Sequence, residues 1–383
     1  MSDQLARILI GGDICPVGET SRYFINDRIS DLFRELGPLM QEADHTVVNL
    51  ECPLTDTSDP IAKNGPVLKA PAVCATGLRK AGIDAVNLAN NHILDHAKSG
   101  LQNTLTVLQK EAIGFFGAGF SPGEADKAYF SIHGELKVAW YGVAEHEFNR
   151  DLRSGMGANA LDVVENSRAI RKLSKEADHV IVLYHGGKEH YPFPTPDQQK
   201  ISRFFIDEGA SVVVAQHSHM AGSYENYEKG LIVYGQGNFL FERNKRNHPA
   251  WYEGFLIQLS LNKSGFAYEF IPFRQSDGFA GVKMMKEGES ASFLRSLDER
   301  SKEVVDTEFV RDQWLKYCKT QRRNYTDRLM GHNRWLRALN RRIGFSDRLY
   351  GIDKVNMIRN VVHCETHREV LRALWEEEGL EDN

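Results

Sequence analysis

Two short runs of β-branched residues, each ending at a histidine, constrain the fold of this chain more than any other feature. The first run, Val180–Leu183, leads to His185, and the second, Ser211–Ala215, leads to His217 and His219. Runs that are apolar on both faces are typical of buried strands in helix-covered sheets. A side chain placed where such a strand ends points into the crevice at the strand's carboxyl end. The two runs therefore deliver three imidazoles to one crevice.

The segment between the two runs predicts a parallel return of the chain. The segment from about Thr195 to Glu208 is long enough for a helix. A strand–helix–strand crossover of this kind returns the chain parallel to its start and is almost always right-handed. Further strands are expected over Arg7–Gly12, His45–Leu50 and Ile83–Ala89. Strands that alternate with helices in this way indicate an α/β protein.

Other segments predict helices and hairpins. Apolar residues at helical spacing predict a helix over Thr20–Glu42, and another is expected over Ala158–Ala177. Strand-like segments at Ala128–Ile132 and Leu136–Val143, joined by a short turn, predict a second, antiparallel sheet region. A polar, proline-rich loop from Cys52 to Pro66 has the length of a substrate-facing element.

Bulk properties exclude several classes of protein. At 383 residues the chain can form one large domain with an appendage, or two domains. Its net charge of -5 gives no whole-chain signal for nucleic acid or a membrane, and no stretch is apolar enough to span a bilayer. The N-terminus lacks the pattern of a signal peptide, and five cysteines without paired spacing argue against a disulfide framework. These features predict a cytoplasmic protein with reduced thiols.

The composition changes at about Asp277, which predicts a first domain over residues 1–276 and a helical C-terminal region over 277–383. Within that region, Arg311–Arg342 is rich in Lys and Arg with interleaved aromatic residues, whereas the last residues are acidic. Such a stretch can contact an anionic or phosphorylated partner, a membrane surface or a synthase subunit. A solvated helical face is the more common explanation.

Polar side chains follow five of the predicted strands, and these are the candidate site residues. Gly11 and Gly12 allow a tight turn ahead of the first of them. Carboxylate, amide and imidazole groups suit Mn, Fe, Zn or Mg, and there are too many here for one tetrahedral zinc. They suit two divalent cations that share a carboxylate, about 3.5–4 Å apart, which can clamp a phosphate. The candidates are Asp13, Glu51, Asn91 with His92, His185, and His217 with His219.

The ordered set of motifs resembles the capsule-synthesis CapA/PgsA family of poly-gamma-glutamate capsule synthesis proteins, which is similar to the calcineurin-like metallophosphoesterases. The resemblance covers roughly residues 6–275 and implies a four-layer αββα sandwich, here followed by the helical extension. The motifs that carry it are Gly12-Asp13, Asn49-Leu-Glu51, Asn90-Asn-His92 with Asp95, His185-Gly-Gly, His217-Ser-His219 and Gly237-Asn-Phe239.

The resemblance also implies a role for each residue. Asp13 and His219 would hold one metal, and Glu51 would bridge to a second. The second metal, of the same divalent kind, would be held by Asn91, His185 and His217. His92 would protonate the leaving oxygen, and Asp95 would orient it.

Two residues depart from the phosphoesterase pattern. The usual Asp-x-His opening reads Asp13-Ile-Cys15 here, so one imidazole is missing, and Glu51 is one methylene longer than the usual aspartate. Cys15 is either a soft ligand or, more often for such a residue, a small buried hydrophobe. Glu189 and His190 lie close enough in sequence to His185 to support the site, or they are ordinary surface residues.

Three functions follow from these observations. The first is a metal-dependent hydrolase acting on a phosphate ester in capsule or exopolysaccharide metabolism. The second is a non-catalytic accessory protein of capsule or polyglutamate synthesis, which binds an anionic polymer or a synthase partner. The third, ligation onto a polyglutamate chain, ranks last because the sequence contains no Gly-x-x-x-x-Gly-Lys-Ser/Thr phosphate loop.

Overall fold

The computed structural model of the protein describes residues 5–151, 153–242, 249–349, 352–364, 366–368 and 370–371. The chain divides into two compact units, Met1–Val310 and Arg311–Asn383. The first unit holds all the sheets together with α9 (Glu287–Val304), so the helical region expected from residue 277 is shared between the units. The acidic residues at the C-terminus lie outside the described residues.

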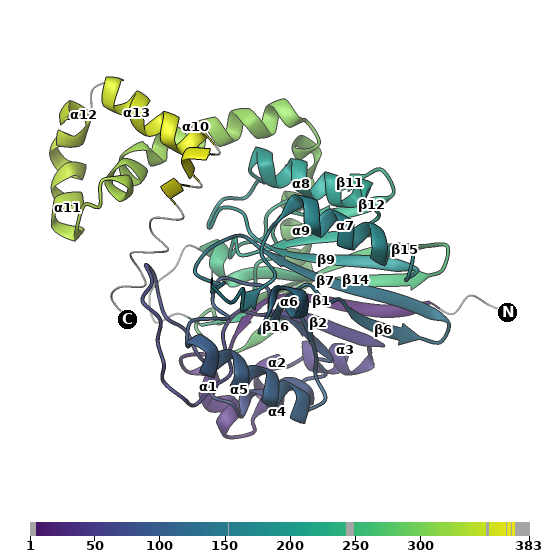
Figure 1. The fold of residues 1–383 in the computed structure, drawn as a ribbon. Helices are drawn as coiled ribbons and strands as arrows, with labels where there is room; N and C mark the ends of the chain where they lie inside the picture. The colour runs from purple at the N-terminus through teal and green to yellow at the C-terminus, as the bar shows by residue number, and fades with distance from the viewer. Residues whose placement is uncertain are drawn as a thin grey trace. The chain divides into compact units, whose positions relative to one another are not determined.

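The first unit has four layers, with two sheets packed face to face and helices on both outer sides (Figure 1). The eight-stranded sheet has the order β16-β15-β14-β1-β2-β3-β4, with β13 also paired to β1. Its strands are β1 (Ala6–Cys15), β2 (His45–Leu50), β3 (Ala85–Asn87), β4 (Gly114–Phe116), β13 (Asn238–Phe241), β14 (Glu253–Asn262), β15 (Gly265–Gln275) and β16 (Val282–Met284).

The six-stranded sheet has the order β11-β12-β10-β9-β7-β6. Its strands are β6 (Tyr129–His133), β7 (Leu136–Ala144), β9 (His179–His185), β10 (Val212–Gln216), β11 (Tyr224–Tyr227) and β12 (Gly230–Val233). A separate two-stranded sheet joins β5 (Ala118–Gly119) and β8 (Gly157–Ala158). The antiparallel sheet region expected around β6 and β7 is therefore wrong in one respect, because β7 pairs in parallel with β9 and makes the sheet mixed.

Helices cover the outer face of each sheet. The eight-stranded sheet packs on α1 (Thr20–Ile25), α2 (Ile29–Phe33), α3 (Leu36–Glu42), α4 (Cys74–Lys80) and α5 (Ala97–Lys110). The six-stranded sheet packs on α7 (Val163–Leu173) and α8 (Pro196–Asp207). The short helices α6 (Pro122–Ala125) and η1 (Pro249–Tyr252) complete the unit. The predicted αββα sandwich is confirmed.

The alternation of side chains along β9 explains the layering. Ile181 and Leu183 lie in the apolar layer between the sheets, whereas Val180 and Val182 pack on the outer helices. Both faces of the strand are thus buried, as its continuous apolar run predicts. His185 has the same parity as Ile181 and Leu183 and so continues the layer between the sheets.

Capping residues explain where α7 and α8 begin. The side chain of Thr195 accepts a hydrogen bond from the Gln198 N–H and starts α8 where a helix was predicted. The helix predicted over Ala158–Ala177 starts later, because the side chain of Asp162 caps α7. The helix predicted over Thr20–Glu42 is three short helices, with Arg34 at a positive φ of 45° between the second and third.

The Gly-Gly pair ahead of Asp13 has a different role from the predicted turn. β1 continues through Cys15, so Asp13 lies within the strand rather than after it. Gly12 is needed for a close approach of two backbones, because an added Cβ would lie 2.0 Å from the carbonyl oxygen of Gly237.

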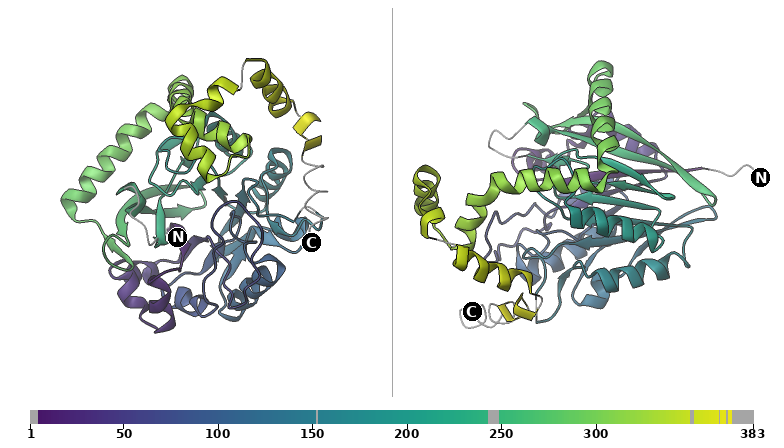
Figure 2. Two further views of the ribbon diagram at one scale, coloured as in Figure 1. Left: turned by 90° about the vertical axis from the view of Figure 1, so that its left-hand side faces the viewer. Right: turned by 90° about the horizontal axis from the view of Figure 1, so that it is seen from above.

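The second unit is helical in its described residues. It contains most of α10 (Thr307–Leu329), a long helix seen in Figure 2, followed by α11 (Arg334–Ile343), α12 (Phe345–Leu349) and α13 (Ile352–His363). No helix in the described part of the chain has both the length and the apolar character needed to cross a membrane.

His45, at the start of β2, makes the stability of the first unit depend on pH. Its buried ring packs against Tyr129, His133 and Trp140. Burial lowers the pKa of His45 from 6.5 to about 4, against the opposing effect of Asp84. A histidine that is neutral in the folded state and charged in the unfolded state lowers the free energy of unfolding as the pH decreases from the unfolded-state pKa to the folded-state pKa.

We expect the free energy of unfolding to decrease by about 2 kcal/mol more between pH 7 and pH 5 in the native protein than in a His45→Phe variant. Phenylalanine keeps the ring stacking but does not titrate. Urea denaturation at the two pH values measures the difference. Equal decreases in the two proteins would contradict the assignment of this pH dependence to His45.

Candidate metal centre

The predicted ligands meet where the two sheets end at the same edge. β1, β2 and β3 of one sheet and β9 and β10 of the other approach this edge with their carboxyl ends. All of the predicted ligands are buried there, and they are Asp13, Glu51, Asn91, His185, His217 and His219.

Asp13 is aimed into the site by a β-bulge. Ile8 and Ile10 face the other sheet, so regular alternation would turn Asp13 towards the helices. Between Ile10 and Asp13, β1 advances three residues while β2 advances two, from Val47 to Asn49. A bulge of this kind reverses the facing of the residues that follow it. As a result, the Asp13 carboxylate accepts a hydrogen bond from the His217 N–H at 3.2 Å.

Asp13, Glu51 and His219 form one group of candidate ligands, which we call the first position. Nδ1 of His219 lies 3.7 Å from Asp13 Oδ2, and Nε2 lies 3.8 Å from Glu51 Oε1. Asn238 Oδ1 lies 2.9 Å from His219 Nδ1 and orients the ring. This arrangement presents Nε2 as the nitrogen for a metal ion.

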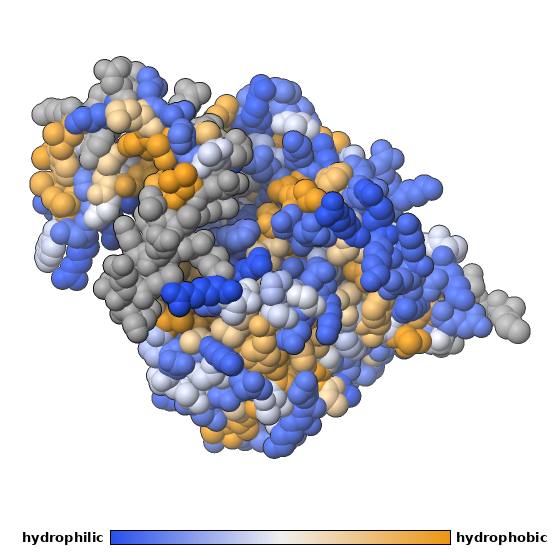
Figure 3. Space-filling model, in the orientation of Figure 1, coloured by the Kyte–Doolittle hydropathy of each residue, from blue (hydrophilic) through white to orange (hydrophobic). Residues whose placement is uncertain are grey.

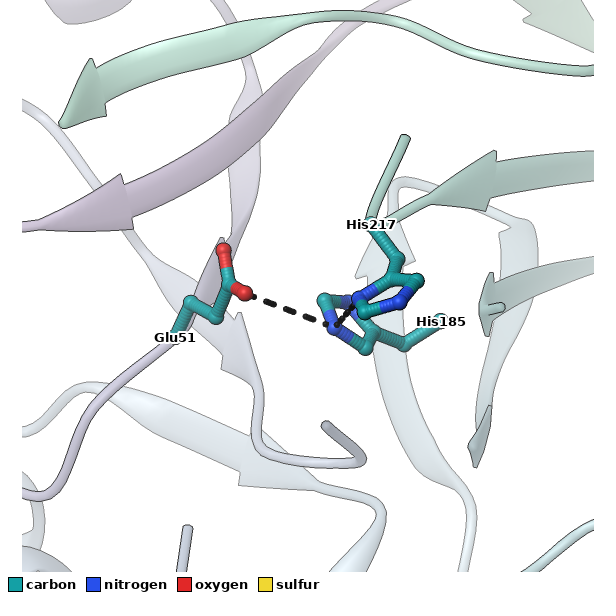
Figure 4. A group of neighbouring side chains, drawn as sticks. All are labelled: Glu51, His185 and His217. Carbon is teal, nitrogen blue, oxygen red and sulfur yellow. Dashed lines mark hydrogen bonds and ion pairs between the residues drawn. The ribbon is translucent and has the colours of Figure 1, made fainter. Parts of the chain in front are cut away.

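Glu51, Asn91, His185 and His217 form the second position. Nε2 of His185 lies 3.1 Å from both Asn91 Oδ1 and His217 Nδ1, and 3.6 Å from Glu51 Oε1. Figure 4 shows the Glu51 carboxylate and the two imidazoles pointing toward one another. Ligand atoms around a tetrahedral ion with bonds of about 2.0–2.2 Å are separated by about 3.3–3.6 Å. The spacing therefore fits a divalent cation, with Glu51 shared between the two positions.

Burial disfavours charge on these ligands. It raises the pKa of Asp13 to about 6, although hydrogen bonds from Asn49 and from the His217 backbone oppose this effect. Burial also lowers the pKa of His185 well below its ordinary value, and the neighbouring His217 and His219 lower it further. Ionised carboxylates and neutral imidazoles are the forms that bind metals, and a cation among them offsets the cost of burying the carboxylates.

His92 and Asp95 form the pair that the sequence predicted, with a lysine added. Nδ1 of His92 lies 2.6 Å from Asp95 Oδ2, and Lys63 Nζ lies 2.7 Å from Asp95 Oδ1. The Leu68 N–H also donates to Asp95. Lys63 and Leu68 both lie in the segment between β2 and α4. Their contacts with Asp95 attach this segment to the His92–Asp95 pair.

Several residues that support the site were given no role in the sequence analysis. Asn49 donates to Asp13 Oδ1 at 2.8 Å and lies 3.2 Å from His185 Nδ1. Asn49 lies two residues after Val47 on the same strand, and Val47 faces the layer between the sheets. This spacing in the sequence indicates that Asn49 faces the same side. Glu147 Oε2 accepts from the Asn91 amide at 3.0 Å. Neither Glu147 nor Lys63 belongs to a motif or a spacing pattern, and only the fold brings them here.

Cys15 is fully buried in an apolar cluster, with Cys52 as a neighbour. Burial raises the pKa of the Cys15 thiol well above its ordinary value. It belongs to none of the ligand groups that the described residues form. Its surroundings are those of a small buried hydrophobe rather than of a soft ligand.

We expect Lys63→Met to lower the free energy of unfolding by about 3 kcal/mol, because it removes one partner of an ion pair whose side chains are both buried. Lys69→Met is the matched control in the same segment, since Lys69 donates to two backbone carbonyl groups at the surface. Its cost should stay below about 1 kcal/mol. Urea denaturation measures both, and equal costs would contradict a structural ion pair at Asp95.

Comparisons with known proteins follow the same motifs. Residues 7–243 match the family of bacterial capsule synthesis proteins PGA_cap. The chain is 26% identical over 279 residues to the capsule biosynthesis protein CapA of Bacillus anthracis, covering 70% of this chain and 67% of that protein. It is 25% identical over 269 residues to the PGA biosynthesis protein CapA of Bacillus subtilis (strain 168), covering 69% of this chain and 70% of that protein.

A crystal structure of a hypothetical protein from Thermus thermophilus is similar over 70% of this chain and 99% of its own, with 17% identity and a TM-score of 0.46. The family match is the decisive comparison, because it spans more than half of the 383 residues and includes every predicted ligand. The resemblance of the motifs is thereby confirmed, and the chain belongs to the bacterial capsule synthesis protein family PGA_cap.

Proposed function

We propose that this protein is a metal-dependent phosphoesterase that acts on a phosphate ester in capsule or exopolymer metabolism. The observation that supports it best is the pair of ligand groups that share Glu51 at the spacing of metal donors. Carboxylate, amide and imidazole donors suit Mn, Fe or Zn. The names of the two Bacillus relatives refer to capsule and PGA biosynthesis, and we extend that setting to this chain.

The chain's own residues supply the acid for such a reaction. A divalent cation at the shared site would polarise the phosphate ester. Asp95 accepts from Nδ1 of His92, so that in the protonated imidazolium the Nε2–H is the group that donates a proton to the leaving oxygen. Lys63 holds Asp95 in place from its other oxygen. Because the segment after β2 contacts the same carboxylate, its position and that of the acid are linked.

We expect Mn-dependent hydrolysis of p-nitrophenyl phosphate or bis(p-nitrophenyl) phosphate, and a loss of at least about 100-fold in His217→Ala. The reason is that His217 supplies one of four donors at the second position and its N–H also holds Asp13. His367→Ala is the control, since this histidine is exposed and lies in the other unit. Retained hydrolysis in His217→Ala would defeat the proposal.

A second candidate function, as an accessory protein at an anionic membrane surface, is favoured by α11. Trp335, Leu339 and Ile343 recur every four residues and are 71%, 46% and 57% exposed. Figure 3 shows apolar side chains gathered at the position of α11. The other side of the helix carries Arg334, Arg337 and Arg341, and the helix contains no acidic residue. An exposed apolar stripe with arginines on the polar face is typical of a helix that lies on anionic lipid.

The full chain should sediment with vesicles of phosphatidylglycerol and phosphatidylcholine, and the Trp335→Glu/Leu339→Glu variant should bind them at least about tenfold more weakly. Ile132→Glu changes an equally exposed apolar side chain on β6 and serves as the control. Binding that is unchanged in the α11 variant, or equally strong to pure phosphatidylcholine, would exclude this surface as the anionic-lipid contact.

A further inference from the structure

The two positions of the proposed metal centre have unequal numbers of protein donors. The second position has four, whereas the first has Asp13, Glu51 and His219. Three donors leave the first position short of a closed tetrahedral set. The missing donor corresponds to the imidazole of the Asp-x-His pattern, and Cys15, which stands in its place, belongs to none of the ligand groups among the described residues.

A carboxylate from the segment that follows β9 approaches His219 of the first position and His217 of the second. A carboxylate oxygen of Glu189 lies within 4.8 Å of ligand nitrogens of both His217 and His219. This third group shares His217 with the second position and His219 with the first, and its carboxylate is partly exposed whereas the two imidazoles are buried. Glu189 is therefore placed on the accessible side of the histidines.

The backbone fixes Glu189 in this place. The N–H of the next residue, His190, donates to the carbonyl oxygen of Ser218 at 2.9 Å, which joins this segment to the His217–His219 turn. His190 has a left-handed conformation (φ 59°), and the Tyr191 N–H returns to the Lys188 carbonyl at 3.2 Å. A tight turn that is hydrogen-bonded to the His217–His219 turn positions the Glu189 carboxylate more precisely than an unattached loop would.

We infer that Glu189 is a further metal ligand, which completes the first position in place of the missing imidazole. The inference rests on the proposed metal centre. With a carboxylate in place of an imidazole, the first position is better suited to Mn or Fe. Three carboxylates against two divalent cations leave a net positive charge, which favours the binding of an anionic phosphate ester.

Glu147, the other nearby carboxylate, does not compete for this role. Its Oε2 lies 3.0 Å from the Asn91 amide nitrogen and 3.8 Å from His217 Nε2. It thus orients Asn91 so that the amide oxygen faces His185. Its contacts lie at the second position, and it belongs to none of the ligand groups found among the described residues.

The test is the number and affinity of Mn ions bound per chain, from elemental analysis and calorimetric titration of the purified full-length protein. Glu189→Gln is expected to retain the tighter ion and to bind the other at least about tenfold more weakly. Glu176→Gln, which removes a charge from an exposed glutamate, should match the native protein. In a His185→Ala background, Glu189→Gln is expected to abolish the remaining ion.

Two outcomes separate this inference from the proposed function. If the native protein binds two ions and Glu189→Gln binds both with unchanged affinity, Glu189 is not a ligand and the metal centre stands without it. If the native protein binds no Mn, the metal centre itself fails, and the inference fails with it. The paramagnetic resonance spectrum of bound Mn gives an independent measure, because loss of one ion converts a coupled pair into an isolated ion.

Discussion

The site depends on burying carboxylates and imidazoles at one end of an otherwise apolar layer between two sheets. Along β9 that layer changes from Ile181 and Leu183 to His185 within a few residues. Ionised groups in such surroundings are costly unless hydrogen bonds or a cation compensate them. Asn49 and the His217 N–H supply part of the compensation to Asp13. A bound divalent cation would supply the rest, which is why a metal is a natural occupant.

The bulge in β1 is the local feature that makes this arrangement possible. It turns Asp13 inward, and two buried glutamines support the backbone beside it. Gln216, at the end of β10, donates to the carbonyl of Gly11 at 3.0 Å, and Gln236 donates to that of Ile10. Buried carbonyl groups beside an irregular strand need such partners. The six-stranded sheet and the chain after β12 therefore stabilise the distortion that the site requires.

Local patterns in the sequence predicted an α/β protein and the common edge at which the candidate ligands lie, whereas the four-layer arrangement followed from the family resemblance. Continuous apolar runs predict strands buried on both faces, and the residue after each run marks a common edge. The sequence did not predict the bulge, since Gly11 and Gly12 are equally compatible with a turn. It also missed Lys63 and Glu147, which reach the site from loops and carry no periodic signal. The prediction of one long helix over Thr20–Glu42 was wrong, because the helical spacing of apolar residues does not reveal the turns that divide it into three short helices.

The two departures from the phosphoesterase pattern, Cys15 in place of a histidine and Glu51 in place of an aspartate, both change which segments supply the ligands. The Glu51 backbone is still held to β1, because its N–H donates to the Ile14 carbonyl at 2.9 Å. Its longer side chain reaches His185 of one strand at 3.6 Å and His219 of the neighbouring turn at 3.8 Å. Because Cys15 belongs to none of the ligand groups among the described residues, Asp13 is the ligand that β1 contributes to them. The ligand set thus shifts away from β1 towards the segments after β9 and β10.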